Sequence, residues 1–244
     1  MVVAVGAVDA NYGVTGINAH ALSFKSAAQC DAIAQRLKAL KASSKASRVT
    51  IIGAGITGVE ALGEILRQGT PGNLKITVLE AQTQLLPNSP KGLDNYIRSL
   101  CEPYPVEFRC NETAQRIRQK SVLLGSGKSL SSDLTIWTGG PAPEPLLSQS
   151  GLAKPASWAP VDDYLHSLHA DGVFIAGDSA DLPSALAKQA YHAIDMGENV
   201  AQNLKAITEG SKMKRFRPSP KPQLISFGGL GCIMRAGKWA AGAP

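Results

Sequence analysis

Residues 48–60 restrict the fold of this chain more than any other stretch of the sequence. Val49, Ile51 and Ile52 make a short β-branched run, which is typical of a strand buried on both faces of a parallel sheet. The residues that follow have the pattern G-x-G-x-x-G over positions 53–58 and lead into an amphipathic segment. This order predicts a strand, a tight glycine turn and a helix that begins at the turn.

Each glycine of the pattern has its own mechanical role in such a turn. Gly53 permits the tight turn out of the strand, Gly55 lets the backbone approach a diphosphate, and Gly58 lets the new helix pack closely on the sheet. The N–H groups at the helix N-terminus can then bind phosphate oxygens. The predicted diphosphate-binding residues are Gly53, Ala54, Gly55, Ile56, Thr57 and Gly58.

The sequence after the glycines also favours a dinucleotide site. Apolar residues follow at helical spacing, at Ile56, Val59, Leu62, Ile65 and Leu66. A second strand is predicted over residues 75–80, and it ends at Glu80, 22 residues after Gly58. An acid at about this spacing accepts hydrogen bonds from an adenosine ribose and repels a 2′-phosphate, so we expect NAD(H) rather than NADP(H). A glycine turn in another kind of βαβ unit is the alternative.

Composition sets broad limits on the class of protein. The 244 residues suffice for one large or two small domains, and 44% hydrophobic with 18% charged residues is ordinary globular composition. Part of the net charge of +6 is concentrated between Lys212 and Lys221. Phe216 is the one aromatic residue among these basic ones, too few for the series of stacking platforms that nucleic-acid binding requires, so we expect no nucleic-acid partner. The basic cluster is either a solvated tail or a segment that favours an anionic membrane surface.

The cysteines and the apolar runs bear on the compartment. Cys30, Cys101, Cys110 and Cys232 have neither C-x-x-C spacing nor histidine neighbours at metal-ligand intervals, so we expect reduced thiols, no metal site and no close redox pair. No apolar run is long enough to cross a membrane, and the N-terminus lacks the charged region of a signal peptide. These features predict a cytoplasmic protein, either free or attached peripherally to a membrane.

The remaining predicted elements complete an α/β chain. Strands are expected over residues 2–6 and 173–176, a helix over 26–41 and a short helix over 93–101. The short runs at 106–108, 114–117 and 122–124, with a hairpin-like turn at 125–128, predict a small antiparallel meander that leads into a strand over 134–136. A helix over 185–204, a basic segment over 212–222 and a final strand over 224–229 are expected to follow.

The order of these segments resembles the two-dinucleotide-fold flavoproteins, the pyridine nucleotide-disulfide oxidoreductase family. The resemblance rests on residues 3–7, 53–80, 135–140 and 173–178 and on the helix sequence at 187–190. Within the family, the chain is most similar to the branch of type II NADH:quinone dehydrogenases and apoptosis-inducing-factor-like reductases. The combination of segments in this order is specific, although each segment alone is not.

The resemblance implies a Rossmann-like NAD-binding domain inserted in an FAD-binding domain. The NAD-binding domain would span residues 48–137, the FAD-binding domain residues 1–47 and 138–210, and a basic C-terminal tail residues 211–244. A full-length member opens with a second glycine motif for the ADP half of FAD. The only such motif here is the one at 53–58, so the FAD-binding domain is expected to be incomplete.

The resemblance also implies site residues. Asp178 would accept a hydrogen bond from the flavin ribitol, and the helix N-terminus near Lys188, Gln189 and Ala190 would face the isoalloxazine carbonyl. Glu60 would lie near the nicotinamide. The other expected cofactor-binding positions are Gly6, Gly139 and Gly177. From the residues alone, Asp178 could instead form an Asx turn or helix cap, and Glu60 could simply be an acid in the first turn of a helix.

Two functions from different classes follow. The first is an FAD-dependent NADH oxidoreductase, in which a hydride passes from NADH to the flavin and electrons then pass to a quinone or another acceptor. Such chemistry needs no side-chain acid or base, so no catalytic residue is assigned. The second is a truncated NAD(H)-binding module without turnover. In a third possibility, the oxidoreductase is completed by a separate polypeptide that supplies the missing unit for binding the ADP half of FAD.

Overall fold

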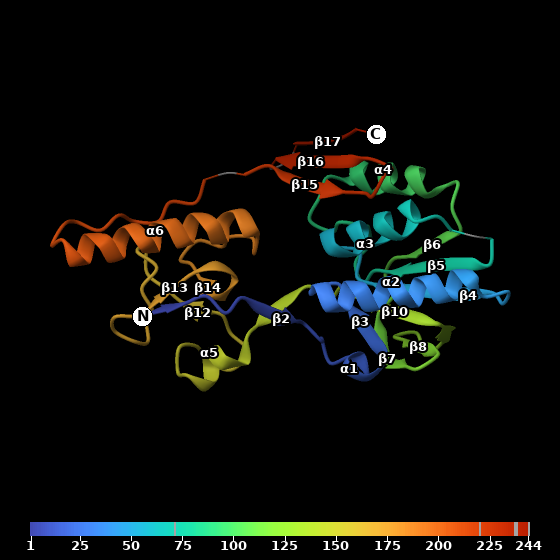
Figure 1. The fold of residues 1–244 in the computed structure, drawn as a ribbon, viewed down its shortest axis with the longest axis horizontal. Helices are drawn as coiled ribbons and strands as arrows, with labels where there is room; N and C mark the ends of the chain where they lie inside the picture. Colours follow the sequence, from blue (N-terminus) through green and yellow to red (C-terminus); the bar gives the residue numbers. More distant parts are fainter. Residues whose placement is uncertain (71, 220, 237–238, 244) are drawn as a thin grey trace. The chain divides into compact units, whose positions relative to one another are not determined.

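The computed structural model describes residues 1–70, 72–219, 221–236 and 239–243, which group into two compact units. One unit contains Met1–Ala10 and Pro141–Lys221, and we call it the split unit. The other contains Asn11–Gly140 and Pro222–Pro244, and we call it the glycine-loop unit. Figure 1 labels the elements of both units.

A five-stranded parallel sheet forms the centre of the glycine-loop unit (Figure 1). In spatial order its strands are β3 (Ala21–Ser23), β10 (Leu134–Trp137), β4 (Ser47–Ile52), β5 (Leu74–Leu79) and β6 (Val106–Arg109). The helices of the unit are α1 (Ile17–His20), α2 (Ala27–Ala42), α3 (Ile56–Arg67) and α4 (Lys91–Cys101). The βαβ unit predicted from residues 48–80 is thus present as β4, α3 and β5.

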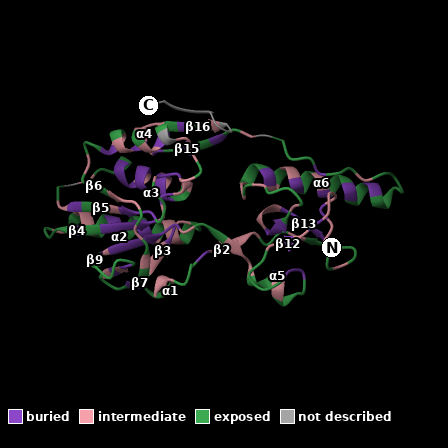
Figure 2. Cartoon of the chain, turned by 180° about the vertical axis from the view of Figure 1, so that it is seen from behind, coloured by how far each residue is buried: buried purple, intermediate pink, exposed green. Residues whose placement is uncertain are grey.

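Apolar side chains from α2, α3 and α4 pack with those of the sheet in one core. Ile51, Leu62 and Ile97 are each fully buried in it. Because a parallel sheet is covered on both faces, its central strands are mostly buried, and the interior positions of β4 and β5 are coloured as buried in Figure 2. The exposed exceptions are Arg48 and Lys75, near the starts of the two strands. The expected α/β class is confirmed.

The predicted antiparallel meander is present, but one of its expected strands pairs with the parallel sheet instead. Strands β7 (Ala114–Arg118), β8 (Ser121–Leu124) and β9 (Ser129–Ser131) form an antiparallel sheet, with the predicted turn between β8 and β9. Residues 106–108, expected to belong to the meander, instead form β6 and pair in parallel with β5. The short apolar run allowed either pairing, and the helix α4 before it supplies the connection that a parallel strand requires.

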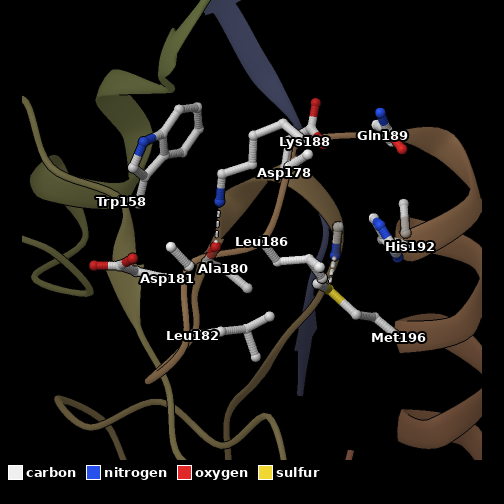
Figure 3. A pocket seen from close by; sticks show the side chains of 14 residues that line it. Trp158, Asp178, Ala180, Asp181, Leu182, Leu186, Lys188, Gln189, His192 and Met196 are labelled. Carbon is white, nitrogen blue, oxygen red and sulfur yellow. Dashed lines mark hydrogen bonds between the residues drawn. The ribbon is translucent and has the colours of Figure 1, made fainter. Parts of the chain in front are cut away.

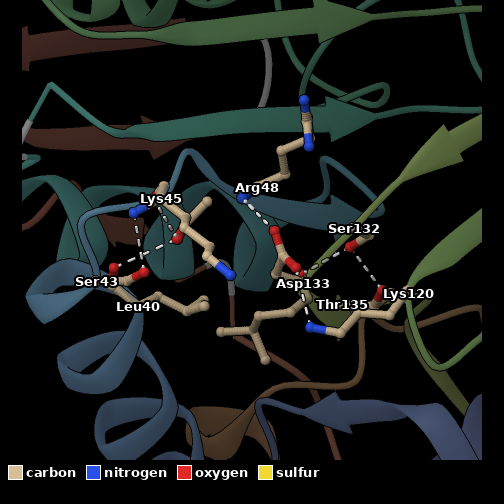
Figure 4. A network of polar contacts seen from close by, with 10 residues as sticks. Leu40, Ser43, Lys45, Arg48, Lys120, Ser132, Asp133 and Thr135 are labelled. Carbon is tan, nitrogen blue, oxygen red and sulfur yellow. Dashed lines mark hydrogen bonds and ion pairs between the residues drawn. The ribbon is translucent and has the colours of Figure 1, made fainter.

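A polar network fixes the start of β4 beside the start of β10 (Figure 4). The Asp133 carboxylate accepts hydrogen bonds from the Arg48 backbone N–H at 3.0 Å and from Lys120 Nζ at 3.1 Å. Burial alone would raise the pKa of Asp133, but the hydrogen bonds from Arg48 and Lys120 lower its pKa overall. The carboxylate is therefore held in its charged form.

The split unit is built from short strand pairs and one long helix. The strands are β1 (Val2–Val3) parallel to β13 (Phe174–Ile175), β2 (Ala7–Asp9) antiparallel to β11 (Pro141–Pro143), and β12 (Ala159–Pro160) parallel to β14 (Ala180–Asp181). The helices are α5 (Pro145–Gln149), the 3₁₀ helix η1 (Gly177–Ser179) and α6 (Ala190–Thr208).

The core of the split unit forms where α6 covers these strands. Phe174, Ile175, Met196 and Val200 are all buried in it, and Figure 2 shows buried positions recurring along α6. The helix was expected over 185–204, but residues 185–189 are not helical and α6 continues to Thr208. Within the described ranges, no helix is long and apolar enough to cross a membrane.

The two units differ from the expected domains at both ends of the chain. Residues 11–47 were expected in the FAD-binding part, but they belong to the glycine-loop unit because β3 pairs with β10 and α2 packs on the same core. Residues 222–243 were expected to belong to a basic tail over 211–244 that contained a single strand at 224–229. Instead, β15 (Gln223–Ser226), β16 (Cys232–Ala236) and β17 (Trp239–Ala243) form an antiparallel sheet. Residues 220, 237, 238 and 244 of the expected tail lie outside the described residues.

This C-terminal sheet covers α3 and α4 of the glycine-loop unit (Figure 1). Ile225, Phe227 and Ile233 are fully buried and belong to the same core as α3. A Cβ added at Gly63 in α3 would lie 2.5 Å from the Phe227 carbonyl carbon and 2.7 Å from the Gly228 nitrogen. The sheet therefore packs against α3 at Gly63, where any side chain would clash with the backbone of residues 227 and 228.

We expect Gly63→Ala to destabilise the glycine-loop unit by about 1 to 3 kcal/mol, because the methyl group must displace backbone. Gly92→Ala is the matched helical control, since a Cβ there has nothing within 4 Å. It should be neutral or stabilising by up to about 1 kcal/mol. Urea unfolding followed by circular dichroism measures both, and equal stability of the two variants would contradict the close packing.

We expect Asp133→Asn to lower stability at pH 7 by about 1 kcal/mol through loss of the charge-assisted hydrogen bonds. Because the folded-state pKa of Asp133 is lowered, its contribution is present above the unfolded pKa of about 3.9 and is lost as the pH falls below it. Chemical unfolding from pH 7 to pH 3 should show the difference shrinking. Asp31→Asn, at an exposed position in α2, is the control. A difference that does not depend on pH would contradict the prediction.

Candidate functional site

The glycine loop joins the end of β4 to the start of α3. Gly53 has a φ of +103°, and a Cβ on it would lie 2.5 Å from the Thr138 carbonyl oxygen. A Cβ on Gly58 would lie 1.9 Å from the Gly53 carbonyl oxygen, so α3 packs directly against the turn. The Thr138 hydroxyl donates to the carbonyl oxygens of Ile52 at 3.0 Å and Gly53 at 2.8 Å. The turn is thus fixed by the end of β10 as well as by its own glycines.

Gly55 differs from the other two glycines of the motif. Its φ is −68°, and a Cβ on it would have nothing within 4 Å. Gly55 is also the N-cap of α3, where no side chain accepts a hydrogen bond from the helix and no acid lies in the first turn. The position therefore combines open space with the positive end of a helix, which is the arrangement that binds a phosphate group.

The Glu80 carboxylate lies against this loop. Its Oε2 accepts a hydrogen bond from Ala54 N at 2.7 Å, and its Oε1 accepts one from Gln82 N at 2.9 Å. The side chain is only 6% exposed. Because each carboxylate oxygen can accept more than one hydrogen bond, these contacts leave acceptor capacity for a ribose hydroxyl. The structure thus brings Glu80 together with the predicted diphosphate-binding residues.

Glu60 contacts the C-terminal sheet, and its expected place near the nicotinamide stays a prediction. Its Oε1 accepts a hydrogen bond from Ser226 N at 3.2 Å, which ties α3 to the C-terminal sheet. Burial raises the pKa of Glu60, and the hydrogen bond from Ser226 partly opposes this effect. Glu60 lies beyond the first turn of α3, so the alternative of an acid in the first turn is wrong.

In the split unit, most of the residues expected beside a flavin line two neighbouring hollows. Gly6, Gly177, Asp178 and Ala190 line a groove of about 540 Å³ between β1, η1 and α6, which we call the groove. Gly177, Asp178, Lys188 and Gln189 line a smaller hollow of about 200 Å³, which we call the pocket. Gly139 belongs to the glycine-loop unit and lines neither of them.

The groove is lined mainly by small side chains. Ala193, Gly197 and Ala201 lie along one side of α6, opposite Ala4 of the N-terminal segment. Asp178 lies at its edge, and no hydrogen bond between described residues ties its carboxylate to the neighbouring backbone. The Asx turn or helix cap considered for this residue is therefore absent from the described structure, and the carboxylate can accept hydrogen bonds from a ligand.

Lys188 lies between the pocket and the strand β14 (Figure 3). Its Nζ donates a hydrogen bond to the Ala180 carbonyl oxygen and lies 4.4 Å from the centre of the Trp158 ring. Burial lowers the pKa of Lys188, and the charges of Asp178 and Asp181 partly oppose this effect. The ammonium group is thus half-buried, and the nearby carboxylates only partly offset the loss of its hydration.

Comparison with known proteins agrees with this architecture. The family model described as pyridine nucleotide-disulphide oxidoreductase matches residues 1–197. The chain belongs to this family. The expected family resemblance is confirmed, and so is the expectation of an oxidoreductase class.

Relatives in this family are longer than the chain. The type II NADH:quinone oxidoreductase of Staphylococcus aureus strain NCTC 8325 / PS 47 is 27% identical over 274 residues, which cover 99% of this chain and 68% of that protein. The structure of NDH2 from Plasmodium falciparum in complex with NADH has a TM-score of 0.87 at 15% identity and covers 100% of this chain and 70% of that one. An NAD-dependent persulfide reductase from A. fulgidus has a TM-score of 0.75 at 18% identity, covering 96% and 43%. The structural likenesses show a shared fold.

Sequence reasoning about this family member missed several residues of the pocket. Trp158, His192 and Met196 all line it, and Met196 Sδ accepts a hydrogen bond from Gly177 N at 3.2 Å. His192 and Met196 lie four residues apart and share one face of α6, a spacing that could have signalled a common environment. Trp158 comes from a distant loop, so no local pattern indicated it.

We expect Glu80→Ala to destabilise the glycine-loop unit by about 1 to 3 kcal/mol, since the buried N–H of Ala54 and the part-buried N–H of Gln82 lose a charged acceptor. Glu64→Ala is the control, because that acid forms an exposed ion pair with Arg67 at 2.7 Å. It should cost less than about 1 kcal/mol. Thermal unfolding measures both, and an equally small effect at Glu80 would show that its carboxylate does not hold the loop.

Proposed function

We propose that this chain binds NADH at the glycine loop as part of an NADH-oxidising flavoprotein. The observation that carries the proposal is the open space at Gly55 on the uncapped N-terminus of α3, next to the Glu80 carboxylate. The diphosphate would bind the N–H groups of residues 55–58, and the adenosine ribose would donate to Glu80. Glu80 would also repel a 2′-phosphate, so NADH is expected to bind better than NADPH.

The groove of the split unit supports a flavin partner for the nicotinamide. Its volume is within the range of cofactor sites, and the unpaired Asp178 carboxylate suits the hydroxyl groups of a ribitol chain. Gly177 has a φ of +69°, and a Cβ on it would lie 3.4 Å from the Ala193 side chain, so the wall of the groove is closely packed there. A bound flavin would supply the hydride-accepting chemistry. The chain's own residues would bind and orient it and exclude water.

We propose a quinone as the electron acceptor, because the relatives include type II NADH:quinone oxidoreductases. Peripheral contact with an anionic membrane is supported by Lys212, Lys214 and Arg217, which are exposed, whereas Arg215 is paired with Asp163 and Lys221 with Asp195.

An NAD(H)-binding module without turnover is the second candidate. The observation that favours it is that the sequence contains one G-x-G-x-x-G motif, which lies in the glycine-loop unit. Among the described residues, the split unit contributes no second loop of this pattern to the groove. A separate polypeptide that supplied such a loop would restore the first function.

The absorbance spectrum of the purified protein, followed by NADH titration with and without added FAD, distinguishes these functions. Flavin absorbance that survives desalting, together with NADH oxidation by a quinone, would support the flavoprotein. NADH binding by a colourless protein that does not retain FAD would support the module. The absence of NADH binding would contradict both.

We expect Gly55→Ala to weaken NADH binding about tenfold or more, because a methyl group would occupy the space of the diphosphate. The stability should fall by no more than about 1 kcal/mol, because alanine is a poorer N-cap than glycine, whereas a φ of −68° accommodates alanine and nothing lies within 4 Å of its Cβ. Gly72→Ala, at another glycine whose Cβ would have nothing within 4 Å, is the control and should bind NADH normally. NADPH should bind the unaltered protein about tenfold more weakly than NADH, a difference of about 1.4 kcal/mol. Unchanged NADH affinity in Gly55→Ala would overturn the assigned phosphate position.

A further inference from the structure

The pocket of the split unit shares Gly177, Asp178 and Ala193 with the groove, but Trp158, His192 and Met196 in its lining have no role in the proposed function. It lies between Trp158, the segment 182–189 and the first turns of α6 (Figure 3). Its volume of about 200 Å³ is somewhat larger than the roughly 150 Å³ of an engineered protein cavity that binds benzene. The pocket is therefore the size of a small organic molecule.

His192 is the first indication of a ligand. The side chain is 7% exposed, and its Nδ1 is buried without a hydrogen-bond partner among the described residues. Burying a polar nitrogen without a partner is unfavourable, and folded proteins leave few such groups. Because His192 lines the pocket, a molecule bound there can satisfy this nitrogen.

The end of α6 is the second indication. This helix has 19 residues, and its N-cap, Gln189, makes no side-chain cap hydrogen bond. No acidic residue lies in its first turn to compensate the positive end of the helix dipole. Gln189, His192 and Ala193 line the pocket, so this helix terminus forms part of its wall.

Lys188 adds a positive charge to the same wall. Asp178 and Asp181 also line the pocket, but Figure 3 shows the Asp181 carboxylate directed away from Leu182 and the Lys188 Nζ directed toward Ala180. Burial lowers the pKa of Lys188 in spite of these two acids, so the ammonium group lacks full compensation where it lies. A negative group in the pocket would supply it.

We propose that the pocket binds a small organic carboxylate. Its carboxylate accepts hydrogen bonds from Lys188 Nζ and His192 Nδ1, and its apolar part contacts Leu182, Leu186 and Met196. An inorganic anion would leave these apolar side chains uncovered, which favours an acid with a short carbon chain. Because a carboxylate only accepts hydrogen bonds, binding selects the His192 form with the proton on Nδ1. The proposal goes beyond the proposed function and does not require NADH or flavin.

Nitrogen NMR of the histidine side chains in the full chain, titrated with sodium propionate, tests the proposal. We expect a saturable shift of His192 toward the Nδ1–H form, with a dissociation constant on the order of 1 mM. The exposed residues His20 and His169 should not shift. Neutral 1-propanol, which has nearly the same size, should not shift His192.

Variants of Lys188 identify the charged partner. Lys188→Met retains the length of the side chain and should weaken propionate binding about tenfold or more, the effect of losing a hydrogen bond to a charged group. Lys188→Arg should restore most of the affinity. Lys154→Met removes an exposed charge in the same unit and should bind propionate like the unaltered protein. Circular dichroism verifies that each variant is folded.

Several outcomes would overturn the proposal. The pocket is not an anion site if propionate causes no saturable shift of His192 up to about 50 mM, far above the expected dissociation constant. An equal response to 1-propanol, or equal propionate binding by the folded Lys188→Met variant, would also reject it. Tighter binding of inorganic phosphate than of propionate would reject the carboxylate class. None of these results would change the outcome of the NADH titration, which depends on the glycine-loop unit.

Discussion

The parallel register of β4 and β5 is the constraint on which the candidate dinucleotide site depends. Ile52 pairs with Leu79, so the residues that follow them, Gly53 and Glu80, leave the sheet at the same edge. The hydrogen bond from Gly53 N to the Leu79 carbonyl oxygen at 2.8 Å and the one from Ala54 N to Glu80 then fix the loop against the acid. A shift of one residue in this register would separate the two groups and turn the strand side chains to the opposite face.

Two contacts from outside the βαβ unit stabilise the sheet edge where Gly53 and Glu80 lie. The Thr138 hydroxyl at the end of β10 holds the carbonyl oxygens of the turn, and the C-terminal sheet contacts α3 through Gly63 and Glu60. Thus a site predicted from residues 48–80 also depends on Thr138, 85 residues from its partner Gly53, and on Ser226, 166 residues from its partner Glu60. Preorganisation of this kind lowers the entropy that a ligand must lose on binding.

The sequence was informative where the signals are local. The strand, the glycine turn and the helix of residues 48–80 could be predicted because periodicity and turn chemistry act over a few residues. The partner of β3 could not, because β10 lies more than 100 residues away and both strands are short. The tertiary partner of Glu60 was equally hidden, since Ser226 contributes only a backbone N–H group, which any residue except proline has. His192 had no signal beyond its place on a helix, because its missing partner is a property of the folded pocket.

The path of the chain between the two units affects how the protein can be synthesised. The chain leaves the glycine-loop unit at Gly140, completes the split unit, and returns at Pro222 to add three strands. During translation, α3 and α4 are synthesised long before the strands that cover them. Their apolar surface therefore stays uncovered until Ile225, Phe227 and Ile233 have been synthesised. A nascent chain that stops before Pro222 would therefore expose a hydrophobic face on the ribosome, which is the kind of surface that chaperones bind.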